Sequence, residues 1–267
     1  MDTISLCGYN ILSKISVGSQ ATVYLAEDEE TKKEFVLKVF SFHNKAAILG
    51  YQNEIIAINK IQHTKNGAFC HGSEYIVKTS HYFTTDDFGV IVMEVLQSDF
   101  YDVVFDYQLT DYQIKLFFNQ LCMAVKHCHS YNVAHLDIKL ENCLYDGRGY
   151  LKLSDFGNAL WMNDGEKYIG VRGTPGYLAP EVASGGSYCP KQADIYSLGV
   201  TFFVLATGQN PKSSKEELLL HAKSLLSRSA YHLLSCMLDD DYSSRFNIDQ
   251  VLSHPYFISS KENQIKK

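Results

Sequence analysis

The residues best suited to chemistry stand in one short segment and in a tripeptide that follows it. The segment from Val133 to Asn142 reads Val-Ala-His-Leu-Asp-Ile-Lys-Leu-Glu-Asn, and an Asp-Phe-Gly tripeptide begins at Asp155, thirteen residues after that Asn. Together they supply an aspartate, a lysine and an asparagine in one loop and a second aspartate on the next turn. Phosphoryl transfer from Mg-ATP uses this set: a carboxylate at the attacking hydroxyl, a cation near the γ-phosphate, and carboxylate or amide ligands for the metal.

A third motif, Ala-Pro-Glu at residues 179–181, completes the pattern. Three motifs in this order and at these spacings are hard to obtain by chance, and over nearly all of its length the chain resembles a eukaryotic protein kinase domain of the Ser/Thr type. It looks most like the calcium/calmodulin-dependent and AMP-activated-like group. The resemblance implies an α+β, bilobal fold with a small antiparallel-sheet lobe, which carries one key helix, and a larger, mostly helical lobe. It implies one domain over residues 1–267, with the N-lobe at about 1–95, the hinge at 96–98, the C-lobe at 99–260 and a polar tail at 261–267.

The resemblance also implies a catalytic role for five residues. Asp137 would accept or orient the proton of the substrate hydroxyl, and Lys139 would neutralise charge on the moving phosphoryl group. The hydroxyl of Thr174 would bridge these two side chains. Asn142 and Asp155 would hold Mg2+, an ion that prefers oxygen ligands.

The same resemblance implies an ATP site between the lobes. Lys38 would bind the α- and β-phosphates and would itself be held by Glu54 on the following helix. The other implied ATP contacts are Ser16, Gly18, Ser19 and Val23 in the glycine-rich hairpin and, around the adenine, Val36, Met93, Glu94, Leu96 and Leu144. Gly18 is the one glycine kept in that hairpin, because Ser16 and Ala21 replace the other two. We therefore expect the backbone to approach phosphate less closely and ATP to bind somewhat weakly.

Ser and Thr are the expected acceptors. Lys139 stands two residues after Asp137, as in Ser/Thr kinases, and Gly-Thr-Pro-Gly-Tyr-Leu at 173–178 resembles their substrate-docking segment. Val171, Pro175 and Leu178 would line an apolar pocket for the residue that follows the acceptor.

Two acidic residues bear on the substrate's charge. Asp99 and Glu141 match positions that bind arginine upstream of the acceptor in basophilic kinases, while Val204 stands at a third position that is acidic in that group. The expected partners are protein substrates with Ser or Thr acceptors and a partial preference for upstream Arg.

Three structural contacts are implied as well. Glu181 would pair with Arg245, and Asp194 would brace the catalytic loop. His135, which in isolation looks like a metal ligand, would instead pack under Phe156. The His-Cys-His run at 127–129 is not expected to bind a metal, because neighbouring residues on a helix point in different directions.

One departure from the family pattern concerns regulation. Many kinases have Arg before the catalytic Asp, where it binds a phosphorylated activation loop, but Leu136 stands there in this chain. Residues 158–173 contain no Ser or Thr, and Tyr168 is their one hydroxyl-bearing residue. We expect activity without phosphorylation of this loop.

The alternative left open is a pseudokinase that works as a scaffold or allosteric partner. The loss of two glycines from the glycine-rich hairpin and the presence of Leu136 favour this alternative. The presence of Lys38, Glu54 and the full catalytic set argues against it. A small-molecule or lipid kinase is disfavoured by the complete substrate-docking segment.

The composition is consistent with this interpretation. With 46% hydrophobic and 20% charged residues the chain can bury a full core, and its net charge of -6 gives no reason to expect a nucleic-acid partner. Seven cysteines without a Cys-x-x-Cys pair indicate reduced thiols, so an intracellular, cytoplasmic location is expected, with the nucleus also open. There is no signal-peptide pattern, and the apolar run Ile195–Ala206 is too short to cross a bilayer. A monomer is expected.

Hydrophobic periodicity predicts the elements that must position these residues. The expected strands cover 10–17, 22–26, 34–40, 75–83 and 88–95. The expected helices cover 45–61, 111–131, 190–206, 214–227, 229–238 and 247–253, and Asp111 is the expected N-cap of the second.

Overall fold

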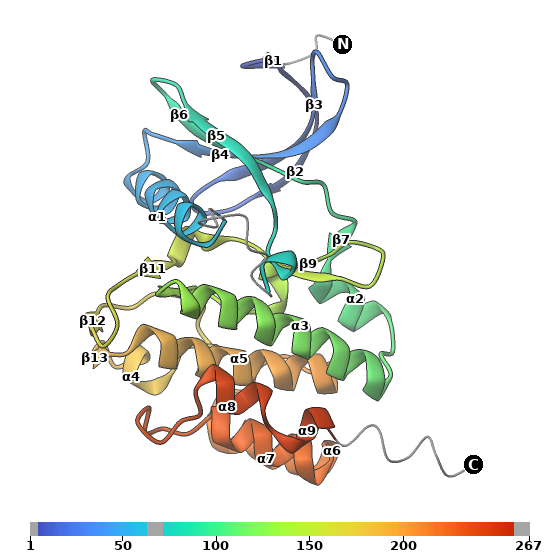
Figure 1. Cartoon of the computed structure of the whole chain (residues 1–267), viewed down its shortest axis with the longest axis vertical. Helices are drawn as coiled ribbons and strands as arrows, with labels where there is room; N and C mark the ends of the chain where they lie inside the picture. Colours follow the sequence, from blue (N-terminus) through green and yellow to red (C-terminus); the bar gives the residue numbers. More distant parts are fainter. Residues whose placement is uncertain (1–4, 63–71, 259–267) are drawn as a thin grey trace.

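A sheet-containing lobe and a helical lobe make up the protein in the computed structural model, which describes residues 5–62 and 72–258 (Figure 1). The predicted tail at 261–267 and Cys70 lie outside the described residues. The upper lobe is a six-stranded antiparallel sheet in the order β1-β2-β3-β4-β6-β5. Its strands are β1 (Ser5–Leu6), β2 (Tyr9–Val17), β3 (Thr22–Asp28), β4 (Glu34–Ser41), β5 (Thr79–Thr84) and β6 (Phe88–Met93).

Strand alternation decides which face of the sheet each side chain meets. Along β4, Leu37 packs into an apolar cluster on one face, whereas Phe40 packs on the other face against α1 (Lys45–Ile61). Lys38, two residues before Phe40, therefore shares the face that looks toward α1. The helix matches its predicted bounds, and its N-cap Asn44 accepts a hydrogen bond from the Ala46 N–H at 2.9 Å.

The lower lobe is built on two long helices that pack against each other, α3 (Asp111–Ser130) and α5 (Pro190–Thr207) (Figure 1). The rings of Phe118 on α3 and Phe202 on α5 stack with centroids 4.3 Å apart. The apolar run Ile195–Ala206 lies within α5 and is almost entirely buried there. The other helices are α2 (Phe100–Asp106), α4 (Pro180–Ala183), α6 (Lys215–Leu225), α7 (Arg228–Met237), α8 (Ile248–Leu252) and α9 (Pro255–Ile258).

Short strands and turns hold the motif residues and the segments around them. The strands are β7 (Ser98–Asp99), β8 (Val133–Ala134), β9 (Cys143–Tyr145), β10 (Leu151–Leu153), β11 (Leu160–Trp161), β12 (Tyr168–Ile169) and β13 (Ser187–Tyr188). In the described part of the chain, 3-10 turns cover Ser73–Tyr75, Leu140–Asn142 and Phe156–Asn158. The pairs β8–β11 and β12–β13 and the sheet β10-β9-β7 fix the loops that run between them.

Several predicted boundaries differ from the observed ones, and the difference is largest at the expected strand 75–83. The N-cap of α3 is Thr110 rather than Asp111, because Thr110 and Gln113 form a reciprocal capping box. The expected strand at 75–83 begins only at Thr79, since Tyr75 ends a 3-10 turn and Val77 donates its N–H to the carbonyl of Leu153 in the lower lobe. The expected strand at 88–95 ends at Met93.

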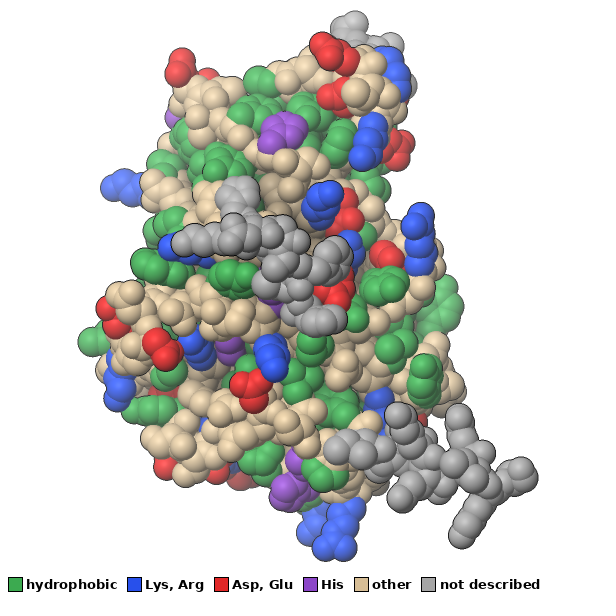
Figure 2. Space-filling view, in the orientation of Figure 1, with side chains coloured by type: hydrophobic (Ala, Val, Ile, Leu, Met, Phe, Trp, Pro, Cys, Tyr) green, Lys and Arg blue, Asp and Glu red, His purple; other side chains and the backbone are tan. Residues whose placement is uncertain are grey.

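The described surface is mixed in charge. On the face seen in Figure 2, basic and acidic side chains are interspersed over both lobes. Within residues 5–62 and 72–258, no helix has both the length and the apolar character needed to cross a bilayer.

Candidate active site

A buried carboxylate holds the catalytic loop from below. Asp194 on α5 is fully buried and accepts the backbone N–H groups of His135 at 2.8 Å and Leu136 at 2.7 Å. The Nε2 atom of His129 lies 2.8 Å from the same carboxylate. Leu136 has a φ of 60°, a left-handed conformation that costs a branched side chain free energy. The predicted bracing role of Asp194 is thus confirmed, and it stabilises a strained turn directly before Asp137.

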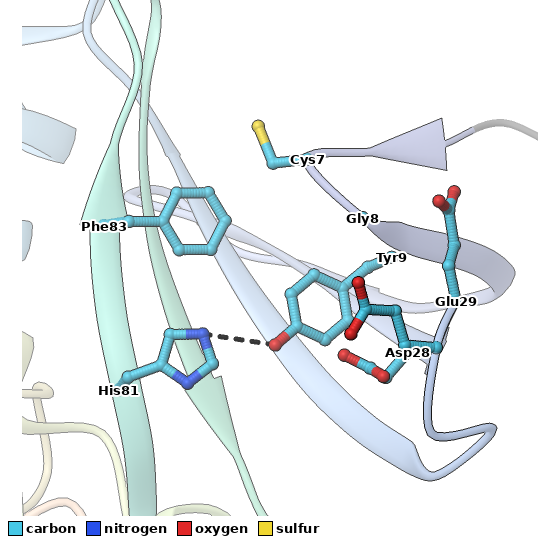
Figure 3. Close-up of a pocket in the computed structure, with 8 residues that line it drawn as sticks. Cys7, Gly8, Tyr9, Asp28, Glu29, His81 and Phe83 are labelled. Carbon is cyan, nitrogen blue, oxygen red and sulfur yellow. Dashed lines mark hydrogen bonds between the residues drawn. The ribbon is translucent and has the colours of Figure 1, made fainter.

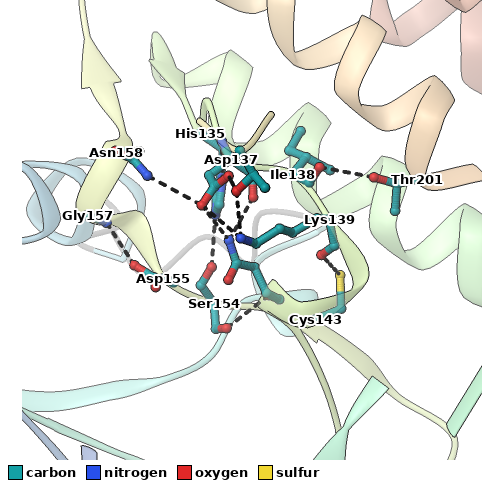
Figure 4. A network of polar contacts seen from close by, with 12 residues as sticks. His135, Asp137, Ile138, Lys139, Cys143, Ser154, Asp155, Gly157, Asn158 and Thr201 are labelled. Atoms are coloured by element: carbon teal, nitrogen blue, oxygen red, sulfur yellow. Dashed lines mark hydrogen bonds and ion pairs between the residues drawn. The ribbon is translucent and has the colours of Figure 1, made fainter. Parts of the chain in front are cut away.

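The three predicted catalytic side chains form one hydrogen-bonded chain. Thr174 donates its hydroxyl to Oδ1 of Asp137 at 2.7 Å and accepts a hydrogen bond from Nζ of Lys139 at 2.7 Å. The amide nitrogen of Asn142 donates to the backbone carbonyl of Asp137 at 2.8 Å and to its Oδ2 at 3.2 Å. Figure 4 shows Asp137 and Lys139 in this polar network. The predicted bridge through Thr174 is present.

The Asp-Phe-Gly turn brings the second aspartate to the same place. Asp155 has a φ of 60°, and its Oδ1 accepts the N–H of Gly157 at 3.2 Å. His135 packs against the Phe156 ring with centroids 4.8 Å apart, and its Nε2 lies 2.9 Å from the carbonyl of Ser154. His135 thus packs under Phe156 and supports this turn, as predicted.

A buried lysine connects the two lobes. Nζ of Lys38 lies 2.6 Å from Oε2 of Glu54 and 2.8 Å from Oδ1 of Asp155. The predicted Lys38–Glu54 ion pair is therefore present. Burial disfavours the charge on Lys38, but attraction to Asp155 and Glu54 outweighs burial and raises the pKa of Lys38. Burial likewise opposes the charge on Asp155, yet Lys38 lowers the pKa of that carboxyl to about 2.

One cavity of about 410 Å³ collects most of the predicted site residues. Its lining includes Ser16, Gly18, Ser19, Val23, Lys38, Asp137, Lys139, Asn142, Asp155 and Thr174. Glu54 lies behind Lys38. Val36, Met93, Glu94, Leu96 and Leu144 do not line this cavity. The first two face each other across β4 and β6, and Glu94 forms an ion pair with Lys152 at 2.6 Å.

A match to the family model for the protein kinase domain covers residues 9–257. The chain belongs to the protein kinase family. It is 32% identical over 93% of its length to CBL-interacting serine/threonine-protein kinase 13 of Arabidopsis thaliana, and 29% identical over 94% to maternal embryonic leucine zipper kinase of Xenopus tropicalis. It is also 28% identical over 93% to the carbon catabolite-derepressing protein kinase of Candida tropicalis. It spans 51%, 39% and 41% of these three proteins, which bear out the expected likeness to the calcium/calmodulin-dependent and AMP-activated-like group.

The kinase cavity contains residues that the sequence did not single out. Gln20 and Gly173 line it, and so does Asn158, whose amide nitrogen lies 3.4 Å from Oδ2 of Asp137. Asn158 directly follows Asp-Phe-Gly, and this position could have predicted its place in the cavity. For Gln20, the corresponding sequence feature was its position in the glycine-rich hairpin.

The Ala-Pro-Glu motif is tied to the helices below the kinase cavity. Nη1 and Nη2 of Arg245 donate to the two carboxylate oxygens of Glu181 at 2.7 and 3.0 Å. The predicted pair is therefore present, in a bidentate geometry. Arg245 also donates to the carbonyls of Asp239 and Gln192, each at 2.8 Å, and its side chain is fully buried.

Among the described residues, no group of three or more His, Cys, Asp or Glu side chains could hold a metal ion. In the His-Cys-His run, His127 Nε2 lies 2.8 Å from the Ile61 carbonyl, while His129 contacts Asp194.

A second cavity, of about 320 Å³, lies in the upper lobe near the ends of β1 and β2. There the hydroxyl of Tyr9 lies 3.1 Å from Nε2 of His81, and Cys7, Asp28 and Phe83 complete much of the wall (Figure 3). The Asp28 carboxylate already accepts hydrogen bonds from the backbone and hydroxyl of Thr31. None of the motif residues reaches this cavity.

Proposed function

We propose that this chain is an active Ser/Thr protein kinase, which transfers the γ-phosphoryl group of Mg-ATP to Ser or Thr hydroxyls of proteins. The observation that carries the proposal is the hydrogen-bonded chain Asp137–Thr174–Lys139 in the same cavity as Lys38 and Asp155. A chain that had lost catalysis would have no need to keep these side chains in mutual contact.

The residues present fit ATP and Mg2+. Asp155 offers a carboxylate held ionised by Lys38, and Asn142 offers an amide oxygen, which together suit a hard divalent cation. Such a cation supplies positive charge that offsets the negative charge of the phosphates. Lys38 would contact the α- and β-phosphates, beneath the hairpin that carries Ser16, Gly18, Ser19 and Val23. The proposed adenine contacts remain Val36, Met93, Glu94, Leu96 and Leu144.

Asp137 would orient the acceptor hydroxyl and receive its proton. Its Oδ1 accepts a hydrogen bond from the Thr174 hydroxyl. Its Oδ2 lies near the side-chain amides of Asn142 and Asn158 and 3.6 Å from Nζ of Lys139. These donors fix the carboxylate and stabilise its charge. Because the transition state of phosphoryl transfer is largely dissociative, positioning contributes more than the strength of the base.

An oriented peptide array with Mg-ATP tests this proposal. We expect incorporation of phosphate at Ser and Thr and an apolar preference at the residue after the acceptor. No incorporation above that of an Asp137→Asn protein, in a chain shown to be folded, would favour the pseudokinase alternative instead.

An acidic group at the start of α2 bears on the charge preference of the substrate. Asp99 precedes α2, and its pKa is raised to about 6 by partial desolvation and then by the charges of Asp102 and Glu141. A carboxylate that is disfavoured in its charged form gains from a nearby cation. An arginine upstream of the acceptor would supply that cation.

We predict that peptides with Arg about three residues upstream have a kcat/KM roughly threefold to tenfold above that of Ala peptides. Since the pKa is raised, Asp99 is charged above about pH 6 and neutral below it. The Arg/Ala ratio should therefore fall between about pH 7.5 and about pH 5.5. Asp99→Ala should flatten the ratio at both values. A ratio near one in the parent protein would remove the idea.

The proposal includes activity without activation-loop phosphorylation. Three cationic side chains already hold the segment after Asp-Phe-Gly. Nζ of Lys60 on α1 lies 3.9 Å from the ring centroid of Trp161, and Nζ of Lys191 bonds Asn132 at 2.7 Å and Asp164 at 3.0 Å. The guanidinium of Arg172 donates to the hydroxyl of Tyr168 at 3.1 Å and to the Asn158 carbonyl at 3.3 Å. Phosphate usually recruits such cations to order the loop.

Leu136 contributes in a different way from the arginine it replaces. Its side chain is buried, and its carbonyl lies where a Cβ at Gly173 would stand. Gly173 has a φ of 109°, so only glycine fits both the conformation and the contact. The catalytic loop and the docking segment thus touch directly.

We predict that protein made in bacteria and stripped by a phosphatase phosphorylates peptide within about twofold of the untreated rate. Mass spectrometry would establish that residues 158–177 carry no phosphate after treatment. Loss of activity on treatment, together with phosphate mapped to Tyr168 or Thr174 beforehand, would contradict the prediction. In that case kinase activity would be regulated by phosphorylation of the activation loop and not, as we propose, by partners, localisation or expression.

A further inference from the structure

Gln20 reaches from the tip of the glycine-rich hairpin to two other parts of the site. It lies in the loop between β2 and β3, where Gly18 donates its N–H to the carbonyl of Ala21 at 2.8 Å. Gln20 lines both the active-site cavity and a smaller one of about 200 Å³ between the hairpin, β4 and the start of α1. Its side chain therefore forms part of the wall between the two spaces.

The carboxamide of Gln20 is seated on two glycines. Its Oε1 lies 2.5 Å from the point where a Cβ on Gly50 would stand, and its Cβ lies 3.4 Å from that point. The same Oε1 would also collide with a Cβ on Gly157. Gly50 lies inside α1, where glycine destabilises a helix relative to alanine. The missing Cβ makes room for Gln20, which gives this glycine a structural reason.

The two glycines belong to the elements that define the catalytic arrangement. Gly50 stands one turn before Glu54 on α1, and Gly157 ends the Asp-Phe-Gly turn that begins at Asp155. Asn53 also donates its side-chain amide to the Gly157 carbonyl at 3.0 Å, which ties α1 to this turn. The seat for Gln20 therefore exists only while α1 and the turn are both in place.

We propose that Gln20 is a positioning residue that latches the glycine-rich loop over the phosphate space when α1 and the Asp155 turn are both in place. Because Ser16 and Ala21 replace two glycines, the backbone of this loop is expected to approach phosphate less closely. The contact of the Gln20 side chain would compensate by holding the loop close to the phosphate space. The effect on turnover rests on the proposed kinase function, whereas the effect on the loop does not.

The test uses Gln20→Ala, Gly50→Ala and the double variant of the full chain. Gly50→Ala displaces only the flexible end of Gln20, so the helix should tolerate it. In hydrogen exchange without nucleotide, the amides of residues 17–22 should exchange about threefold to tenfold faster in each variant. The KM for Mg-ATP should rise by a similar factor while kcat stays within about twofold, which a general loss of structure would not produce.

Coupling between the two positions decides the matter. In the Gln20→Ala background, Gly50→Ala should change neither the exchange rate nor KM further, and it should raise the Tm because alanine favours the helix. Gln52→Ala removes an exposed glutamine from the same helix and should behave as the parent protein does. The latch proposal would be wrong if the two substitutions multiplied each other's effects on exchange rate and KM in the double variant. It would also be wrong if Gln20→Ala left the exchange rate unchanged. If the parent protein transfers no phosphate, the proposed function fails, while the exchange data still decide whether Gln20 is a latch.

Discussion

Replacing Asp137 with asparagine is expected to lower kcat by about 10²- to 10⁴-fold while the domain stays folded. Asparagine preserves the shape of the side chain and can still contact Thr174, whose hydroxyl lies 2.7 Å from Oδ1. It cannot receive the proton of the substrate hydroxyl, and it lacks the charge that Lys139 and the neighbouring amides stabilise. Single-turnover phosphorylation of a Ser peptide would measure the loss without a contribution from product release.

Asp155→Asn should give a loss of similar size for a different reason. It removes the charge that attracts Lys38 and replaces one of the two proposed Mg2+ ligands, a carboxylate, by a neutral amide. Raising the Mg2+ concentration should therefore recover part of the activity of Asp155→Asn and none of that of Asp137→Asn. Asp86→Asn, at an exposed turn of the upper lobe, is the matched control and should leave kcat unchanged. Near-parental turnover in either site variant would show that the assigned roles are wrong.

The sequence predicted the elements whose signals are local. The bounds of α1 agree because apolar spacing and the Asn44 cap coincide at its start. The expected strand at 75–83 is wrong only at its start, because its first residues make contacts that no local pattern predicts. Ile76 bridges to Leu153 in parallel, and Val77 donates to the same residue's carbonyl. Long-range pairing thus overrode strand propensity at this junction.

For the proposed active site, motifs predicted the catalytic set, and the structure brings Asp137, Lys139 and Thr174 into mutual contact. Residues whose placement depends on close contact with the backbone of distant segments could not be predicted from the sequence. Gln20 depends on the absence of a Cβ at both Gly50 and Gly157, and neither glycine is near it in sequence. Similarly, Lys60 and Trp161 meet through the packing of α1 on β11. Pairs of this kind need the fold before they can be seen.

The second large effect is expected at Arg245, where Arg245→Met should lower the free energy of unfolding by about 3–5 kcal/mol. Methionine preserves much of the length and apolar volume, but it leaves the Glu181 carboxylate unpaired in a mostly buried position. It also removes the donors to the carbonyls of Asp239 and Gln192. A loss of this size is a large share of the roughly 5–15 kcal/mol that stabilises a typical domain.

Urea denaturation should show a lower midpoint at an unchanged m-value, because the native state loses stability without losing compactness. Arg245→Lys keeps the charge but not the paired fork, so its loss should be intermediate. Adding Glu181→Gln to Arg245→Met should restore part of the stability, since most of the single-variant penalty comes from the isolated carboxylate rather than from the net value of the pair. Arg228→Met replaces an exposed arginine at the start of α7 and should change stability by no more than about 0.5 kcal/mol. A loss below about 1 kcal/mol for Arg245→Met, or no recovery in the double variant, would mean that this pair does not hold the Ala-Pro-Glu segment against the helical lobe.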